Sequence, residues 1–428
     1  MLQLLVASSR KHDDVDVDAN FASELGPALT IKDRYRFKFS YVVDRSTMAP
    51  VREILEYLTY SASKRSNSET TIKNKADACY ELFLYLDAID LDYRDICLDT
   101  LVEYKERLSA YISPRTRRPL AAGTVKYRLQ VAREFCEYHK LIEPRAAKAI
   151  VGRPTYGSFP AYSAKSDSEL SVKNNSSLVE YIIKDDLNKL MSELAGNPNE
   201  RGLNYSRDWL ISAFCLTTGS RISETLGLNT GEIYAAYKSV QEGKPAVIRL
   251  IKTKGSKPRD IIVDRDLIML LKRYVDSDGP RARAVEIGQA HRSSFKDNES
   301  VFVNESDCAP RFAGRTYSAK RAEEHFAAVQ IRIGMVRTVP IYDLETREPI
   351  GERQVNKHRI HHLRHTYAIQ AWHAYRRLPE IDRWIKIQGQ LGHKSHEVTA
   401  SIYLRAVKHL EGDARDVMGA YLKTLAGF

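Results

Sequence analysis

Apolar residues at helical spacing fill the region from residue 51 to about residue 148. In the stretch 71–86 they recur every three or four positions, and the stretches 101–108 and 125–138 continue the pattern. This spacing puts apolar side chains on one face of each helix and predicts a helical domain with a shared core. In the first stretch that face carries Ile72, Ala76, Cys79, Leu82, Phe83 and Leu86.

The segments on either side of this helical region have different patterns. Apolar and polar residues alternate from Tyr35 to Val43, which predicts a β-strand within an N-terminal extension of residues 1–50. Residues 149–178 contain glycines, prolines and a run of small polar residues, so we expect an exposed linker. The sequence therefore predicts a second domain over residues 179–428.

The second domain opens with helical periodicity over residues 186–194 and 209–217. Two runs rich in β-branched residues, 246–251 and 260–263, then flank a polar turn that contains glycine, which predicts a hairpin. Helical spacing resumes after the hairpin, stops in the polar stretch 281–310, where we expect a loop, and returns toward the end. The expected fold class is mainly α with a small β-hairpin or sheet.

Composition narrows the class of protein. The 428 residues are 43% hydrophobic and 28% charged, as in a soluble globular protein of two to three domains. Five irregularly spaced cysteines without a C-x-x-C pair predict neither disulfides nor a zinc site. No run of 18 apolar residues occurs and the N-terminus lacks an apolar signal, so we expect a cytoplasmic protein without a membrane span.

Positive charge is in excess, and part of it is concentrated in the first domain. The net charge of +11 favours a polyanionic partner, nucleic acid before a membrane surface. A basic turn over residues 113–119 is followed by further cations, and such a cluster is either a solvated face or a phosphate-contacting surface. The candidate DNA-contacting residues here are Arg115, Arg117, Arg118, Lys126 and Arg128.

Two short segments of the second domain combine turn signals with charge. Gly219 can end one helix so that Arg221 starts the next, with Glu224 one turn later. Alone, such an Arg and Glu are most often a surface ion pair. The hairpin turn 252–259 carries four cations. It is either a solvated tip or a turn that brings one lysine into a neighbouring site.

Four histidines lie close together, at positions 358, 361, 362 and 365. Histidines at i and i+4 can ligate zinc from one helical face. However, the segment lacks the glutamate of a zinc-protease motif, and Arg359 and Arg364 add positive charge that opposes a metal cation. We therefore predict no metal site.

The last segment is Leu391-Gly392-His393, followed ten residues later by Tyr403. A lone tyrosine on a helix is more often a half-buried core aromatic than a nucleophile. The order of the segments is the specific signal. An Arg, a Lys on a hairpin, H-x-x-R, L-G-H and then a Tyr together resemble the catalytic signature of the tyrosine recombinase (lambda-integrase-like) family. The resemblance covers about residues 180–410 through motifs, and Tyr403 stands one residue later than in many members.

The resemblance implies a fold and a set of site residues. Residues 51–148 resemble, more loosely, the family's helical, SAM-like core-binding domain, and residues 179–428 its α+β catalytic domain with a C-terminal tail. Lys257 and Arg259 of the hairpin turn are further candidates for DNA contact. Matched residue by residue, the catalytic positions are Arg221, Lys254, His361, Arg364, His393 and Tyr403, with Glu224 in support.

These residue types suit attack on a phosphodiester. Arg221 and Arg364 can grip its non-bridging oxygens and neutralise the charge that grows in the transition state. Because cationic side chains supply that charge, no metal cofactor is expected. A phenol with a pKa of about 10 needs a base, for which His361 is the candidate. Lys254 is the candidate acid for the leaving 5′-oxygen, and the covalent 3′-phosphotyrosyl link to Tyr403 makes ATP unnecessary.

The resemblance thus implies a site-specific recombinase for integration, excision or transposition of a mobile element. Its partners would be double-stranded DNA with specific recombination sites, three further copies of the chain in a homo-tetramer, and accessory DNA-bending proteins, in the cytoplasm at the nucleoid. A type IB topoisomerase or a telomere resolvase is the alternative that shares the chemistry. A non-catalytic DNA-binding regulator is the alternative of another class, and the complete residue set argues against it.

Overall fold

The computed structural model describes residues 4–8, 39–44, 46–65, 68–142, 180–196, 205–251, 258–305, 308–404 and 406–407. They fall into two compact units. The first runs up to residue 175 and also includes residues 340–351, and the second comprises the rest from residue 176 onward. None of the helices over these stretches combines the length and apolar composition that crossing a bilayer requires.

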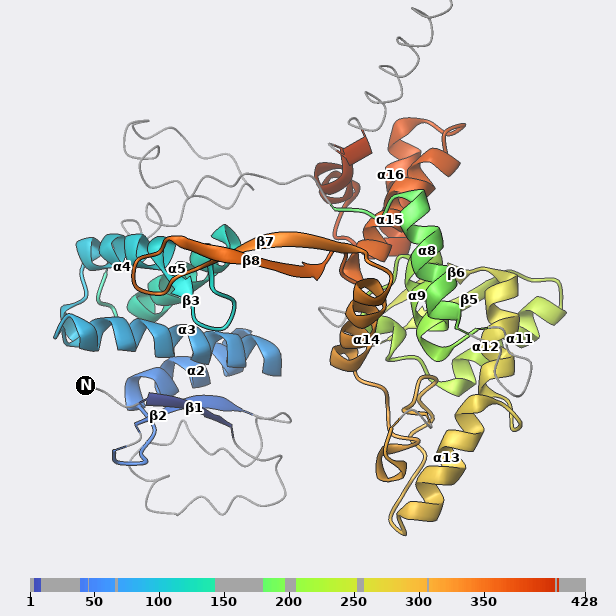
Figure 1. Cartoon of the computed structure of the whole chain (residues 1–428), viewed down its shortest axis with the longest axis horizontal. Helices are drawn as coiled ribbons and strands as arrows, with labels where there is room; N and C mark the ends of the chain where they lie inside the picture. Colours follow the sequence, from blue (N-terminus) through green and yellow to red (C-terminus); the bar gives the residue numbers. More distant parts are fainter. Residues whose placement is uncertain are drawn as a thin grey trace, which may run out of the picture. The chain divides into compact units, whose positions relative to one another are not determined.

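The first unit is built on helices packed around one core (Figure 1). Helix α3 packs against α2 and α5, and α4 packs against α5. Ile72, Cys79 and Leu82 are completely buried on α3, so the helical face predicted there is confirmed. The elements are α2 (Arg52–Arg65), α3 (Glu69–Ala88), the short 3-10 helix η2 (Tyr93–Asp95), α4 (Leu98–Ala110) and α5 (Ala122–Tyr138).

Two small antiparallel sheets complete this unit. Strand β1 (Leu4–Ser8), which the sequence did not predict, pairs with β2 (Ser40–Asp44). The strand predicted over residues 35–43 is confirmed from Ser40 onward, and its first residues lie outside the described part. Strands β3 (Ile112–Ser113) and β4 (Arg118–Pro119) hold the basic turn between them.

A buried charged group links two helices of the first unit. Lys75 on α3 and Glu134 on α5 lie almost fully buried, with Nζ 2.6 Å from Oε2. The Tyr57 hydroxyl accepts from Lys75 at 3.0 Å and donates to Glu134 at 3.1 Å. Because a buried charge without its partner is costly, this group favours the one packing in which both charges meet.

The second unit surrounds α9 (Arg207–Thr218), which packs against helices on several sides (Figure 1). Leu210, Ile211 and Phe214 on α9 are all but inaccessible to solvent. Residues 396–404 are also helical. The other helices are α8 (Lys184–Ala195), α10 (Ile222–Thr225), α11 (Thr230–Gln241), α12 (Arg265–Val275), α13 (Pro280–His291), η3 (Pro310–Phe312), α14 (Ala319–Arg332), α15 (His361–Ala374) and α16 (Glu380–Leu391).

Two hairpins begin and end within the described residues of this unit, and the sequence predicted the first of them. Strands β5 (Ala246–Leu250) and β6 (Arg259–Val263) pair with buried Ile248 opposite buried Ile261, which confirms the predicted hairpin. Strands β7 (Val336–Tyr342) and β8 (Pro349–Asn356) form a second hairpin that was not predicted, and its residues 340–351 belong to the first unit. Most residues of this second hairpin are exposed or half-buried, so its sequence lacks the alternation that marks a strand.

The loop predicted over residues 281–310 is wrong in its first part. Residues 280–291 form α13, which begins with Pro280 at a position where the missing N–H costs nothing. This helix buries few large apolar residues, so it has almost no hydrophobic periodicity to find. The fold class itself, mainly helical with small antiparallel sheets, is confirmed.

Candidate active site

Helix α9 leads directly into the first motif. It ends at Gly219, whose φ of +68° lies in the left-handed region. A Cβ there would come within 2.5 Å of Tyr367 and 2.6 Å of Leu391 side-chain atoms, so only glycine fits this turn. The turn lets Arg221 begin α10, and Arg221 donates to Glu224 from its backbone N–H and from Nη1, both at 2.8 Å.

Glu224 also binds Arg259, at the start of β6. Nη1 and Nη2 of Arg259 donate to the two carboxylate oxygens at 2.9 and 2.8 Å, and its Nε donates to the Gln390 carbonyl at 3.1 Å. Burial alone would raise the pKa of Glu224, but the hydrogen bonds and charges of Arg259 and Arg221 outweigh it and bring the pKa down to about 2. Arg259, predicted to contact DNA, therefore has its guanidinium engaged by Glu224.

Arg364 lies on the first turn of α15 and is 2% exposed. Its Nη1 donates to the Gly219 carbonyl at 2.5 Å, and its Nη2 donates to the Leu391 carbonyl at 2.8 Å and to His393 Nε2 at 3.1 Å. These partners carry no charge. Burial, together with the nearby charge of Arg221, lowers the pKa of Arg364 to about 10, so the guanidinium stays charged at neutral pH.

The L-G-H motif ends α16 and presents its histidine to Arg364. Gly392 is left-handed (φ +69°), and a Cβ there would lie 2.7 Å from Arg259 Cδ. Because an arginine can only donate, His393 Nε2 must accept from Arg364. The neutral ring therefore carries its proton on Nδ1, which donates to Thr399 Oγ1 at 2.9 Å. Burial and the charge of Arg364 lower the pKa of His393 to about 4.

Tyr403, the predicted nucleophile, belongs to the helical residues 396–404 and is 1% exposed. Its ring lies nearly parallel to that of His393, with centroids 6.2 Å apart and an interplanar angle of 12°. Its hydroxyl forms a hydrogen bond of 2.9 Å with His365 Nδ1. Burial raises the pKa of Tyr403 to about 12, although the charges of Arg364 and Arg221 oppose the rise. The phenol is therefore protonated in this state.

The structure thus brings five predicted residues close together. Arg364, His393 and Tyr403 lie in successive contact, and the charges of the ion pair Arg221–Glu224 act on Arg364. His361 is the first residue of α15 and is exposed, with its ring edge-to-face on that of His365 at 4.7 Å between centroids. Lys254 and Lys257 lie outside the described residues. The sequence did not predict the contact between His365 and Tyr403. His365 follows Arg364 directly in the sequence.

The remaining two histidines of the run have acidic partners. His358 Nε2 lies 3.3 Å from Asp186 Oδ2, and His362 Nε2 lies 3.4 Å from Glu180 Oε2. Over the described stretches no group of three or more His, Cys, Asp or Glu side chains is arranged to hold a metal ion. These contacts connect His358, just before α15, and His362, on its first turn, to residues 180–186 at the start of the second unit.

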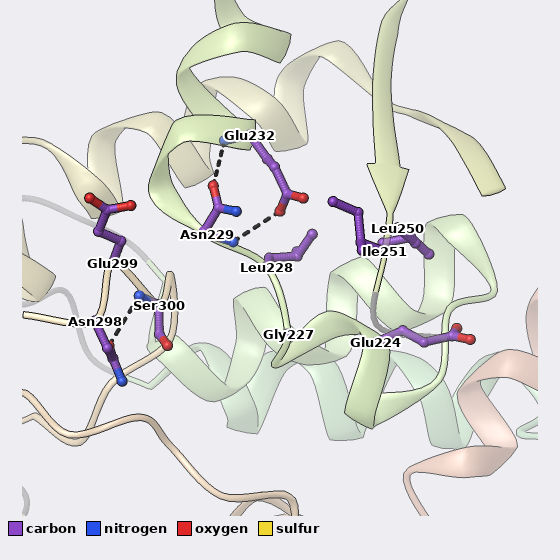
Figure 2. Close-up of a pocket in the computed structure, with 10 residues that line it drawn as sticks. All are labelled: Glu224, Gly227, Leu228, Asn229, Glu232, Leu250, Ile251, Asn298, Glu299 and Ser300. Atoms are coloured by element: carbon purple, nitrogen blue, oxygen red, sulfur yellow. Dashed lines mark hydrogen bonds between the residues drawn. The ribbon is translucent and has the colours of Figure 1, made fainter. Parts of the chain in front are cut away.

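A pocket lies beside Glu224 on the side toward α11 (Figure 2). Asn229 and Glu232 cap this helix reciprocally, with hydrogen bonds of 3.0 and 2.9 Å. The charged side chains among the described lining residues are the carboxylates of Glu224, Glu232 and Glu299. Such a lining of carboxylates does not suit a phosphate anion.

The basic cluster of the first unit divides into two kinds of residue. Arg115, Arg117 and Arg118 are exposed on the turn between β3 and β4. Lys126 is half-buried on α5, and Arg128 pairs with Glu81 on α3 at 3.1 Å. The turn therefore presents its cations to solvent, whereas the Arg128 guanidinium has an acidic partner within its own unit.

Comparisons with known proteins find similarity at the level of structure. No protein-family profile matches the sequence, and no curated protein matches it either. The XerH site-specific recombinase bound to a palindromic difH substrate has 17% identity and a TM-score of 0.51, covering 88% of this chain and 92% of that one. The Tn1549 transposon integrase with circular-intermediate DNA has 13% identity and a TM-score of 0.48, covering 81% and 94%. A lambda integrase dimer bound to a core site has 12% identity and a TM-score of 0.47, covering 82% and 77%.

At such low sequence identities, structural similarity is evidence about the fold alone. The evidence here is the similarity to the XerH structure. The motif-based resemblance and the structural comparison agree. The chain has the fold of the site-specific tyrosine recombinases.

Proposed function

We propose that this protein is a site-specific DNA recombinase that cleaves and rejoins DNA through a 3′-phosphotyrosyl link to Tyr403. One observation carries the proposal. Arg364 bonds His393, whose ring lies against Tyr403, although the three residues come from separate segments of the sequence. Arg221 approaches the same place from the end of α9, and its charge acts on both Arg364 and Tyr403.

The two arginines are the groups that bind the scissile phosphate. Arg364 has neutral partners, two carbonyls and an imidazole, so its full charge is available to an incoming anion. Arg221 is held by Glu224, which fixes the direction of its guanidinium while part of it stays exposed. Preorganised donors of this kind act on the charge that develops in the transition state. This role of the side chains requires neither a metal ion nor ATP.

The remaining polar groups move protons or complete the phosphate site. His393 donates a hydrogen bond to a phosphate oxygen once its Nε2 is released from Arg364 and protonated. Lys254, which lies between β5 and β6 in the sequence, protonates the leaving 5′-oxygen. His361, exposed at the start of α15, faces the DNA. Glu224 and Arg259 act indirectly, because they hold Arg221 and the Gln390 carbonyl in place.

We propose that residues 149–178 link a core-binding domain to a catalytic domain. We further propose that selected cations of both domains contact the DNA. They are Arg115, Arg117, Arg118, Lys126, Arg128 and Lys257. We infer that the protein acts on specific recombination sites as a homo-tetramer, with accessory DNA-bending proteins, in the cytoplasm at the nucleoid. Integration, excision or transposition of a mobile element is the process it serves.

The test begins with selection of a DNA site. The full-length protein is used to recover bound duplexes from a random-sequence library, and the recovered site is rebuilt with a nick that lets the 5′-end diffuse away after cleavage. Wild-type protein should form an SDS-stable adduct with this duplex. Tyr403→Phe removes one oxygen and little volume, so it should bind the same duplex but form no adduct.

The outcomes separate the alternatives. An adduct that persists in Tyr403→Phe would assign the nucleophile elsewhere. Binding without any adduct in the wild type would make the protein a DNA-binding regulator. Relaxation of supercoiled plasmid by the monomer without site preference would indicate a topoisomerase, and conversion of the selected duplex into hairpin ends would indicate a telomere resolvase.

A further inference from the structure

The Tyr403 hydroxyl has a close protein partner. The side chain is 1% exposed, and its oxygen lies 2.9 Å from Nδ1 of His365, with the ring centroids 5.5 Å apart. His365 sits on α15 one residue after Arg364, so the helix that positions a phosphate-binding arginine also holds the nucleophile.

The surroundings of His365 keep its ring neutral. Burial is the main cause that lowers the pKa of His365 to about 3. The groups that face the ring act in the same direction, namely His361, His362 and Arg364 on its own helix and His393 beyond α16. A neutral imidazole has one bare ring nitrogen. Tyr403 is itself protonated, so its hydroxyl can donate to that nitrogen.

We propose that His365, through Nδ1, is the group that receives the phenolic proton of Tyr403 when the tyrosine attacks DNA. This inference rests on the proposed function and revises the prediction that His361 is the base. In the protein without DNA, Nδ1 accepts from the hydroxyl and the ring carries its proton on Nε2.

The step balances without any further reagent. The Tyr403 O–H bond breaks and its proton moves to His365 Nδ1, while the phenolic oxygen forms a bond to phosphorus. The bond from phosphorus to the 5′-oxygen then breaks, and that oxygen takes a proton from Lys254. In rejoining, the 5′-hydroxyl returns its proton to Lys254 as its oxygen attacks phosphorus. The bond from phosphorus to the Tyr403 oxygen then breaks, and the imidazolium returns its proton to that oxygen.

The same surroundings couple proton transfer to DNA binding. An imidazolium at position 365 is unfavourable while only cations and neutral rings surround it. A phosphate held by Arg221 and Arg364 brings negative charge beside the ring and removes part of this penalty. Tyr403 therefore becomes reactive only when a phosphodiester occupies the site, which protects the protein from futile attack.

The first experiment uses the full-length protein without DNA. Nitrogen-15 NMR of labelled histidine reports whether Nδ1 of His365 is bare, with the resonance assigned by its loss in His365→Asn. We expect a bare Nδ1 whose shift moves when Tyr403→Phe removes the donor. A protonated Nδ1, or a shift unaffected by Tyr403→Phe, would overturn the proposal, whatever the protein does to DNA.

The second experiment measures adduct formation on the nicked duplex recovered from the random library. Asparagine places an oxygen near the position of Nδ1, so His365→Asn can still accept from Tyr403 but cannot take its proton. We expect adduct formation to slow by about a hundredfold or more at neutral pH, the scale of a lost general base. The deficit should shrink as pH rises, because hydroxide then removes the phenolic proton.

Matched variants separate this role from a structural one. His373→Asn, exposed in the last turn of the same helix, should keep the wild-type rate and pH profile. His365→Leu should lose the rate but keep DNA binding. A His365→Asn protein with the wild-type rate, or one slowed equally at every pH, would contradict the proposal. A wild-type protein that forms no adduct would instead remove the proposed function, and the NMR result would still decide whether the hydrogen bond exists.

Discussion

Arg259 and Glu224, 35 residues apart in the chain, share two parallel hydrogen bonds of 2.9 and 2.8 Å. The side chain of Glu224 is fully buried, and its second partner is Arg221. One carboxylate thus ties the start of β6 to the arginine predicted to bind phosphate. The pair acts as a positioning device for groups on two separate elements.

This carboxylate should make stability depend on pH in a defined range. Its folded-state pKa of about 2 lies below its ordinary value of 4.5, so its contribution is complete above pH 4.5 and is lost as pH falls toward 2. Glu224→Gln should therefore be less stable than wild type at pH 6, with a difference that narrows below pH 4.5. Urea unfolding across this range measures it. The exposed Glu242→Gln is the control, and a Glu224→Gln difference that stays constant with pH would contradict the assignment.

Arg364→Lys should keep the charge but lose the geometry. A lysine has one donor group and cannot reach the Gly219 carbonyl, the Leu391 carbonyl and His393 together. Adduct formation should slow by about a hundredfold or more, with DNA affinity nearly unchanged. Arg383→Lys is the matched control, because Arg383 also donates to two backbone carbonyls but at the start of α16. Equal effects of the two changes would argue against a special role for Arg364.

The exposed basic turn should contribute to DNA affinity without sequence preference. Replacing Arg115, Arg117 and Arg118 together with Ala removes cations that face solvent, and each lost phosphate contact should lower the slope of log affinity against log salt by about 0.9. Fluorescence anisotropy on the selected duplex and on a random duplex at several salt concentrations measures this. The triple change Arg52→Ala, Arg94→Ala and Lys140→Ala removes three charges that are also exposed, from other parts of the unit, and should leave the slope unchanged.

The buried pair in the first unit should be costly to break but not to replace. Lys75→Met leaves Glu134 buried without its cation and should destabilise the protein by about 3–5 kcal/mol. Combining it with Glu134→Leu should recover most of that loss, because no unpaired charge remains. Urea unfolding followed by circular dichroism gives both values, and tryptophan fluorescence serves as a control because Trp209, Trp372 and Trp384 all lie in the second unit. A single variant as stable as wild type would mean that the pair is not buried in solution.

The four-histidine run should work without a metal. His358 and His362 face Asp186 and Glu180, and His365 faces Tyr403, so three of these rings have partners in the folded chain. Treatment with a chelator followed by gel filtration should leave adduct formation unchanged. Loss of activity that zinc restores would show that the run holds a metal ion and would overturn the proton-transfer scheme.

Much of the site could be predicted from the sequence because its backbone requirements are local. Gly219 and Gly392 mark left-handed turns at helix ends, and the residues that follow them, Arg221 and His393, take up the positions those turns allow. Helices with a continuous apolar face, such as α3, could also be predicted, because burial of one face imposes a 3.6-residue period on the apolar positions. The prediction of function rested on the order of these local motifs along the chain.

The partners of the charged and polar side chains were decided only by the tertiary structure. Nothing in the segment 252–259 predicts that Arg259 binds a glutamate 35 residues earlier in the chain, and the structure shows this pairing. Likewise the H-x-x-R-H motif offers two histidines as the base, and only the packing of α15 against residues 396–404 puts His365 on the Tyr403 oxygen. Hydrophobic period is a property of one segment, whereas a hydrogen bond depends on the distance between two, and folding sets that distance.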